Sequence, residues 1–234
     1  MSFYQSFASY YDRIFPLNQT TLSFVSNYFQ PGECILDIGA GTGNLAIALA
    51  DNGIDVTASE PDGTMAESIR SKVDMKGLTL SVHTKAMEQI EEFQRNFDGI
   101  ICIGNTLPHL PDEKSIKDFL SQCQKKLNKD GRLILQTVNY DKVLSTDDFS
   151  FPVIKKDDFS FTRRYEKVND HIYFTSILTV NEESTENTIP LYPITSQRLI
   201  SLLTKAGFQS VQVYGNFKAE DFNRDSPALI VVAQ

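Results

Sequence analysis

The sequence predicts an α/β protein: a doubly wound, mostly parallel sheet with an inserted antiparallel hairpin that forms a lid. From residue 20 to about 138, short buried runs alternate with amphipathic helical patterns, which is typical of a parallel sheet covered on both faces. A glycine-rich turn follows the first run, and from residue 159 the pattern changes to the two-residue alternation of antiparallel strands. We expect one domain over residues 1–234, with residues 1–30 as a helical cover and residues 150–193 as the lid insertion.

Five short, mainly apolar runs are the predicted parallel strands. They are residues 34–38, 55–58, 78–82, 97–103 and 132–136. Helices connect them, and the helical period is clearest after the fourth run, where Asp112 is the expected N-cap. A further helix follows Thr195 and ends at Gly207, because glycine readily adopts the left-handed conformation that ends a helix.

The predicted lid begins with two strands, residues 159–168 and 171–180, and Asn169-Asp170 between them is a two-residue turn. A hairpin does not fit inside a doubly wound sheet, so we expect it to project from the sheet. The polar stretch 182–187 that follows is predicted to be a loop. In the N-terminal cover, apolar residues recur at helical spacing. They are Phe3, Tyr4, Phe7, Tyr10, Tyr11 and Ile14.

Net charge and composition exclude several classes of binding partner. With 22 Lys and Arg against 30 Asp and Glu, the net charge is −8, which argues against a nucleic-acid partner because phosphate would be repelled. The three cysteines form no CxxC pair and have no nearby histidine pair, so we expect no disulfide framework and no metal site. Apolar runs fall well short of the roughly 18 residues of a membrane span, and no export signal is visible. We therefore expect a cytoplasmic protein without a membrane partner.

The most informative segment is the glycine-rich turn within residues 35–45. Gly39, Gly41 and Gly43 let the backbone approach a ligand closely and adopt positive φ. Their spacing is GxGxG, whereas the dinucleotide fingerprint is GxGxxG, and Asn44 stands where the last glycine of that fingerprint would be. The spacing therefore departs from that of a dinucleotide site.

Two carboxylates accompany this turn. Asp37, two residues before the first glycine, would repel a pyrophosphate but can hold an ammonium group. Glu60 ends the second predicted strand, where a carboxylate accepts ribose hydroxyls in dinucleotide sites. A ligand with an amino acid at one end and a nucleoside at the other satisfies both, and S-adenosylmethionine is such a ligand.

On these residues the sequence resembles the class I S-adenosylmethionine-dependent methyltransferases, in particular the small-molecule branch with the glycine and sarcosine N-methyltransferases. Asp37, the three glycines and Glu60 match motifs of the family, and residues 97–110, 127–133 and 139–141 resemble its later segments. The resemblance implies a seven-stranded, Rossmann-like sheet, the cofactor S-adenosyl-L-methionine, and a monomer or homodimer. The cofactor-binding residues that it implies are Asp37, Gly39, Gly41, Gly43, Asn44, Glu60, Pro61, Met65, Ala86, Met87, Ile103, Gly104 and Asn105.

Three residues are candidates for catalysis. Tyr11 belongs to a segment that resembles the N-terminal cover over the methyl end of the cofactor in related enzymes. His109 follows the fourth strand, at the edge where a parallel sheet binds its ligand. Arg163 and Arg164 are neighbours on a strand, so they face opposite ways and at most one points into a pocket. We take Arg164 as the arginine that binds a substrate carboxylate.

One position departs from the family pattern. After the third strand many members carry an aspartate that binds the adenine amine, and this sequence has Lys85 there. A lysine cannot accept that hydrogen bond. Adenine recognition is therefore expected from backbone groups, from Glu88 or from a shifted register.

The leading functional hypothesis is methyl transfer to a small-molecule acceptor, an amine or amino-acid-like compound, by in-line displacement. An NAD-dependent oxidoreductase is an alternative that rests on the glycine-rich turn and Glu60, but Asn44 and Asp37 argue against it. A non-catalytic nucleoside-binding module on the same fold is another. Nucleic-acid methylation is disfavoured, because residues 105–108 are not the Asn-Pro-Pro-aromatic arrangement that holds a flipped adenine.

Overall fold

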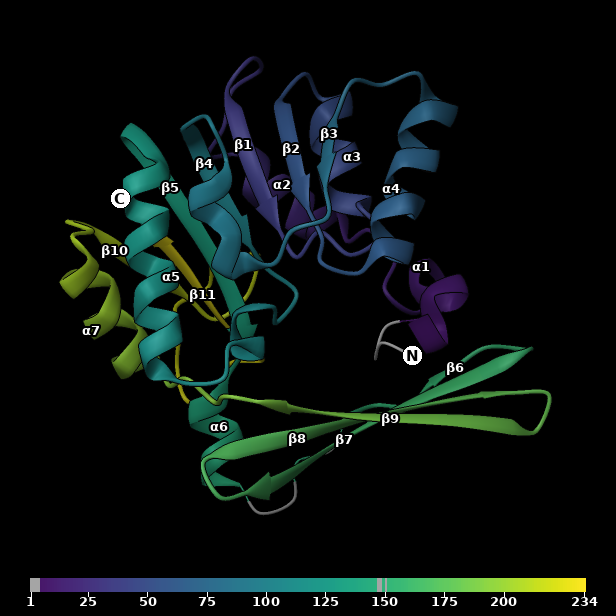
Figure 1. Ribbon diagram of the computed structural model, residues 1–234. Coiled ribbons are helices and arrows are strands. Elements are labelled where there is room, and N and C mark those ends of the chain that lie inside the picture. Colours follow the sequence, from purple (N-terminus) through teal and green to yellow (C-terminus); the bar gives the residue numbers. More distant parts are fainter. Residues whose placement is uncertain (1–4, 147–148, 150) are drawn as a thin grey trace.

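The computed structural model describes residues 5–146, 149 and 151–234, so Phe3 and Tyr4 of the expected cover lie outside the described residues. Two sheets make up the molecule, and helices cover both faces of the larger one (Figure 1). The larger sheet has seven strands in the order β10-β11-β5-β4-β1-β2-β3, and β11 runs antiparallel to both of its neighbours. The predicted doubly wound, mostly parallel sheet is therefore confirmed.

The parallel strands of this sheet overlap the five predicted runs, but β3 begins three residues later than predicted and β5 extends beyond the predicted run at both ends. Its strands are β1 (Cys34–Ile38), β2 (Asp55–Ser59), β3 (Ser81–His83), β4 (Phe97–Cys102), β5 (Leu127–Val138), β10 (Val211–Tyr214) and β11 (Ala228–Ala233). Side chains alternate between the two faces of each strand. On β1, Ile35 belongs to the apolar layer beneath α2, α3 and α4, and Leu36 to the layer beneath α5 and α7.

Helices connect the strands, and two of their ends lie at predicted capping residues. They are η1 (Gln5–Tyr10), α1 (Tyr11–Ile14), α2 (Gln19–Ser26), α3 (Asn44–Asp51), α4 (Gly63–Lys76), η2 (Met87–Glu92), η3 (Leu107–His109), α5 (Glu113–Lys126), α6 (Tyr140–Ser145) and α7 (Ser196–Ala206). Asp112 accepts a 2.7 Å hydrogen bond from the Ser115 amide at the start of α5, as predicted. Gly207 ends α7 with φ +106°. Within the described residues, no helix is both long and apolar enough to cross a bilayer.

The second sheet is antiparallel and has the order β6-β7-β8-β9. Its strands are β6 (Ile154–Lys155), β7 (Phe159–Val168), β8 (His171–Val180) and β9 (Glu183–Leu191). The predicted hairpin is β7 and β8, joined at the predicted two-residue turn. The predicted loop over residues 182–187 is wrong, because residues 183–191 pair along the whole of β8. Pairing satisfies the backbone of β8, and polar side chains are suited to β9 because it is an edge strand.

The N-terminal segment lies between the two sheets (Figure 1). Phe7 and Ile14 pack with Phe159, Phe161 and Leu178 of the second sheet in one apolar cluster. We call residues 5–15 the cover and the sheet of β6–β9 the lid sheet. The face of the lid sheet that carries Phe159 and Phe161 is its inner face, because it faces the cover.

Candidate active site

The site lies at the carboxyl ends of β1, β2 and β4, where parallel sheets bind ligands. The loop between β1 and α3 is held there by β2, because the amides of Gly39 and Ala40 donate to the Ser59 carbonyl over 2.8 and 3.1 Å. Gly41 and Gly43 have φ values of +59° and +79°, a conformation that side chains with a Cβ rarely adopt. The glycine-rich turn therefore exposes backbone, rather than side chains, to the site.

Two buried carboxylates flank this loop. Asp37 and Glu60 are 3% and 5% exposed. Burial, together with the charge of Glu60, raises the pKa of Asp37 to about 7. Burial also raises the pKa of Glu60 to about 7, although Glu60 accepts hydrogen bonds of 2.9 and 2.8 Å from the amides of Asp62 and Gly41. No lysine or arginine of the described chain forms an ion pair with Asp37, so its charge is available to a cationic ligand.

Two adjoining pockets bring most of the sequence-predicted residues together. The first pocket contains Glu60 and is lined by Tyr11, Ile38, Gly39, Gly41, Glu60, Pro61, Met65, Ala86, Met87, Glu88, Ile103, Gly104, Thr106 and His109. The second pocket contains Asp37 and is lined by Tyr11, Phe15, Pro16, Leu17, Asn18, Thr21, Asp37, Gly39, Ala40, Thr42, Asn44, Leu45, Ile103, Gly104, Gln136 and Phe217. Gly43 and Asn105 are not among these lining residues.

Sequence reasoning missed several of the lining residues. Thr106 and Gln136 lie at the carboxyl ends of β4 and β5, and this edge of the sheet was the signal that could have found them. Phe217 comes from the loop after β10, far along the chain, and no local pattern marks it. In the described part of the chain, no three Cys, His, Asp or Glu side chains are grouped as metal ligands.

Tyr11 of the cover lies over the glycine-rich loop. A Cβ atom added to Gly41 would be 3.0 Å from the Tyr11 hydroxyl oxygen. Burial raises the pKa of Tyr11, and the charges of Glu60 and Asp12 raise it further, so this hydroxyl keeps its proton. The tyrosine therefore presents an uncharged hydroxyl at the border of the two pockets.

His109 lines the first pocket from η3. Its loop is held in place by the Tyr192 amide, which donates to the Pro108 carbonyl over 2.8 Å. Burial lowers the pKa of His109 to about 4. The imidazole is therefore neutral near pH 7 and keeps one nitrogen lone pair.

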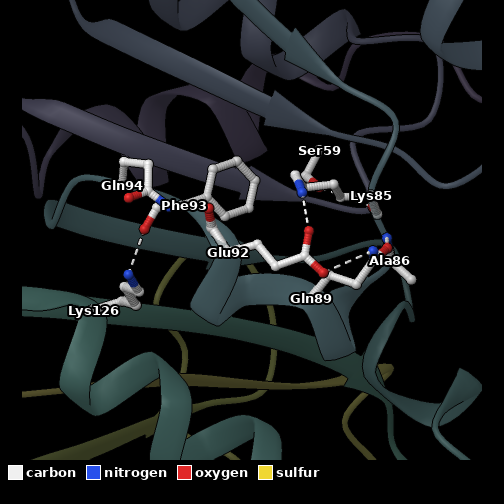
Figure 2. A network of polar contacts seen from close by, with 8 residues as sticks. All are labelled: Ser59, Lys85, Ala86, Gln89, Glu92, Phe93, Gln94 and Lys126. Carbon is white, nitrogen blue, oxygen red and sulfur yellow. Dashed lines mark hydrogen bonds and ion pairs between the residues drawn. The ribbon is translucent and has the colours of Figure 1, made fainter.

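Lys85 contributes its backbone, not its side chain, to this region (Figure 2). Its ammonium group pairs with Glu92, and its carbonyl accepts a 2.9 Å hydrogen bond from the Ser59 hydroxyl. Gln89 accepts a hydrogen bond of 2.9 Å from the Ala86 amide and donates to Glu92 over 3.1 Å. This network fixes the start of η2, so that residues 86–88 face the first pocket.

Asn105 follows the pocket loop and connects it to the lid sheet. Its side chain accepts a 2.9 Å hydrogen bond from the Val138 amide and donates to the Tyr140 hydroxyl over 3.1 Å. The Tyr140 ring stacks on Tyr165 of β7, with ring centroids 6.4 Å apart. Burial raises the pKa of Tyr165 to about 12. The lid sheet is therefore anchored beside the first pocket by a buried, uncharged polar cluster.

The structure does not bring Arg164 to this site. Arg164 lies on the outer face of the lid sheet and pairs with Glu186 over 2.8 Å. Arg163 shares the inner face with Phe161 and Tyr165, because residues two apart on a strand point the same way. Sequence alternation indicated that the two arginines face opposite ways, but only the packing of the lid sheet determines which one faces inward.

Comparisons with known proteins give consistent results. Residues 35–131 match the family model described as a methyltransferase domain. A glycine/sarcosine N-methyltransferase of Aphanothece halophytica is 27% identical over 206 residues, which cover 82% of this chain and 72% of the relative. One of Halorhodospira halochloris is 26% identical over 215 residues, 86% of this chain and 74% of the relative. The solved structure of an S-adenosylmethionine-dependent methyltransferase from Clostridium acetobutylicum aligns over 100% of this chain and 99% of its own with a TM-score of 0.83; at 14% identity this likeness concerns the fold.

Proposed function

We propose that the chain is an S-adenosylmethionine-dependent methyltransferase, which the match to a methyltransferase domain and the likeness to glycine/sarcosine N-methyltransferases support, and that it methylates the nitrogen of a small-molecule amine that also carries a carboxylate. The observation that carries this proposal is the Arg163 guanidinium on the inner face of the lid sheet. Its Nε is buried without a hydrogen-bond partner, and no carboxylate of the described chain pairs with Arg163. An unpaired, half-buried cation is costly, and a ligand carboxylate is the partner that suits a guanidinium best.

The two pockets fit the cofactor. The Asp37 carboxylate would bind the ammonium of its methionine part, and the Glu60 carboxylate would accept hydrogen bonds from the ribose hydroxyls. Burial raises the pKa of both carboxyl groups and thus disfavours their ionised forms. A cation beside Asp37 would act in the opposite direction and favour the ionised form. Pro61 and Met65 supply apolar surface on the adenosine side. When bound, the cofactor supplies an activated methyl group on a sulfonium.

The acceptor would lie against a polar row on the inner face of the lid sheet. The row consists of Arg163, Ser176 and Asn187, which are directly opposite one another on β7, β8 and β9. The neighbouring rows carry apolar or aromatic residues on β7 and β8, with Phe161 opposite Leu178 on one side and Tyr165 opposite Phe174 on the other. Three polar side chains in register within an apolar face indicate recognition of a polar group.

Contacts on either side support the proposed position of this row over the site. Phe161 packs on Phe7 and Phe15 of the cover, with ring centroids 5.4 and 5.7 Å apart, and Tyr165 packs on Tyr140 beside Asn105. Arg163 lies between these two anchors, with its guanidinium 4.7 Å from the centroid of the Phe151 ring and within 3.3 Å of the Pro152 carbonyl. The row therefore faces the space between the cover and the β4 loop.

In this arrangement the protein aligns the reactants and excludes water. The nitrogen lone pair of the acceptor attacks the methyl carbon from the side opposite the sulfur, so that the N–C bond forms as the C–S bond breaks. Such positioning is worth about 7–11 kcal/mol in favourable systems. Neutral His109 would relay the proton that the nitrogen loses to solvent, and the uncharged hydroxyl of Tyr11 would stabilise the positive charge that moves onto the acceptor.

The test is methyl transfer from radiolabelled cofactor to small amines with and without a carboxylate, using Arg163→Met and the matched control Arg164→Met. We expect Arg163→Met to raise KM for the carboxylate-bearing acceptor about 100-fold, since a hydrogen bond to a charged group is worth ~1.5–3 kcal/mol. Arg164→Met should change this KM less than about threefold, because its exposed ion pair with Glu186 lies outside the proposed acceptor site and contributes little to stability. Equal activity of both variants on every acceptor would contradict the assignment. Cofactor binding without transfer to any amine would instead favour the non-catalytic alternative.

A further inference from the structure

A hydrogen-bonded network ties the cover to the glycine-rich loop and to α4. The Asp12 carboxylate accepts a hydrogen bond from the Thr42 hydroxyl and another, of 2.9 Å, from the side-chain amide nitrogen of Asn44. It also pairs with the Lys72 ammonium over 2.6 Å. Lys72 also donates to the Thr42 carbonyl over 2.9 Å and to the Asn44 side-chain oxygen over 3.0 Å. Burial opposes ionisation of Asp12, but the hydrogen bonds from Lys72 and Thr42 outweigh it, so that the pKa of Asp12 is lowered. Each of the two charged groups thus has three partners.

Neither charged group of this network lines the first or the second pocket. Tyr11, the neighbour of Asp12 in the chain, lines both pockets, and so do Gly39, Ile103 and Gly104. A cofactor with its ribose at Glu60 and its ammonium at Asp37 would span both pockets and pass Tyr11, which lines both of them.

A second anchor holds the same turn of chain to the lid sheet. Arg13 donates two hydrogen bonds, of 2.7 and 2.6 Å, to Asp158 before β7. The guanidinium also lies 4.8 Å from the ring centroid of Phe159. Both side chains of this pair are about half exposed. Asp12 is exposed to a similar extent, but Lys72 is only 22% exposed and each charged group of the Asp12 network has three partners. The Asp12 network also contacts the glycine-rich loop itself, so it is the restraint that ties Tyr11 to that loop.

We propose that Asp12 and Lys72 are positioning residues that hold Tyr11 closed over the cofactor and so set the rates at which the cofactor binds and its demethylated product leaves. A gate outside the pockets slows passage in both directions, so its removal raises both rates while the dissociation constant changes little. This inference rests on the placement of the cofactor proposed above, and it is independent of which acceptor is methylated.

The test measures binding and release of radiolabelled S-adenosylmethionine by rapid filtration, with excess unlabelled S-adenosylhomocysteine as the chase. Asp12→Asn and Lys72→Met should each speed both association and release about tenfold, the equivalent of ~1.4 kcal/mol, and keep the dissociation constant within about threefold. Because the two residues act as one unit, the double variant should be no faster than the faster single variant. Should one variant fail to fold, the other still reports on the network.

The matched controls are Asp118→Asn and Lys114→Met, which break an exposed ion pair on α5, remote from the site. They should leave both rates unchanged. Unaltered rates in Asp12→Asn and Lys72→Met, or a double variant in which the two effects multiply, would overturn the proposal. If, instead, Asp37→Asn leaves the affinity for the cofactor unchanged, the proposed placement of the cofactor is wrong. That result would not contradict the role of Asp12 and Lys72 in holding Tyr11.

Discussion

Asp37 is the residue on which the proposed cofactor site depends most. It lies at the end of β1 with 3% of its surface exposed, and burial and the charge of Glu60 oppose its ionisation. An isolated buried charge destabilises the folded protein, so the carboxylate is poorly explained by stability. A cationic ligand that offsets this cost explains it, and an ammonium group is such a cation.

We therefore expect Asp37→Asn to weaken binding of S-adenosylmethionine by about 100-fold in calorimetry, since a hydrogen bond between charged partners is lost. The melting temperature of the cofactor-free variant should be unchanged or higher, because the amide removes a buried charge at nearly constant volume. Asp118→Asn on the surface of α5 is the matched control. An unaltered dissociation constant in Asp37→Asn would show that this carboxylate does not bind the ammonium.

For single residues, the sequence predicted the position of those side chains that lie a fixed number of residues from a recognisable motif. Asp37 and Glu60 follow directly from their places at the ends of two strands. The choice of Arg164 did not hold, because alternation fixes only that the arginines oppose each other. Which of them faces inward depends on Phe161 packing against the cover, a contact between residues far apart in the chain.

Among the elements, α6 is tied to the loop between β10 and β11 by Lys142, which donates to the Asp225 carbonyl over 3.3 Å, and by the buried Asn139. Asn139, 1% exposed, caps α6 by accepting a hydrogen bond from the Lys142 amide. Its amide nitrogen lies 3.0–3.3 Å from the carbonyl oxygens of residues 223, 224 and 226. Ser226 is buried, whereas Asn223 and Arg224 are exposed, and the Asn223 carbonyl also accepts from the Ser226 amide. Removing the Asn139 side chain would therefore cost the buried Ser226 carbonyl this donor and α6 its cap.

Asn139→Ala should lower the free energy of unfolding by about 2–4 kcal/mol, the sum of a lost cap and of the buried Ser226 carbonyl left without this donor. The comparison is Asn18→Ala, which removes the cap of α2, where Asn18 accepts from the Thr20 amide, and should cost only about 1 kcal/mol. Urea unfolding followed by circular dichroism measures both. Equal losses in the two variants would mean that the links to the β10–β11 loop contribute nothing.

Helices and strands could be predicted where the pattern of neighbouring residues in the chain is enough to form them. The hairpin of β7 and β8 was found because its two-residue turn and its alternation lie within 22 consecutive residues of chain. Strand β9 was missed because its polar residues resemble a loop, and only the free edge of β8 makes it a strand. An edge strand takes its conformation from its partner more than from its own sequence.

At the scale of the whole molecule, the two sheets approach the site from different sides. The parallel sheet presents the ends of β1, β2 and β4, the lid sheet presents its inner face, and the cover lies between them (Figure 1). Periodicity predicted the parallel sheet and the β7–β8 hairpin of the lid sheet, but neither β6 and β9 nor how the lid sheet is placed. That placement depends on the cluster of Phe7, Ile14, Phe159, Phe161 and Leu178, in which the first two residues are more than 140 positions away from the other three.

The stability of the whole chain is linked to pH through Asp37 and Glu60. Their pKa values are about 7 in the folded protein and about 4 in an unfolded chain, so between these values the folded state binds more protons. The contribution of the two groups to stability is therefore greatest at or below the unfolded values and is lost as the pH rises towards 7.

A bound ammonium favours the ionised form of Asp37, which reverses this trend for the complex. We expect S-adenosylmethionine to raise the melting temperature more at about pH 8 than at about pH 6, measured by differential scanning calorimetry at one cofactor concentration. Asp37→Asn should remove most of that difference, because the amide does not titrate. A larger shift at the lower pH in the unmodified protein would mean that the cofactor binds the protonated site, and the ammonium would then have to be placed elsewhere than at Asp37.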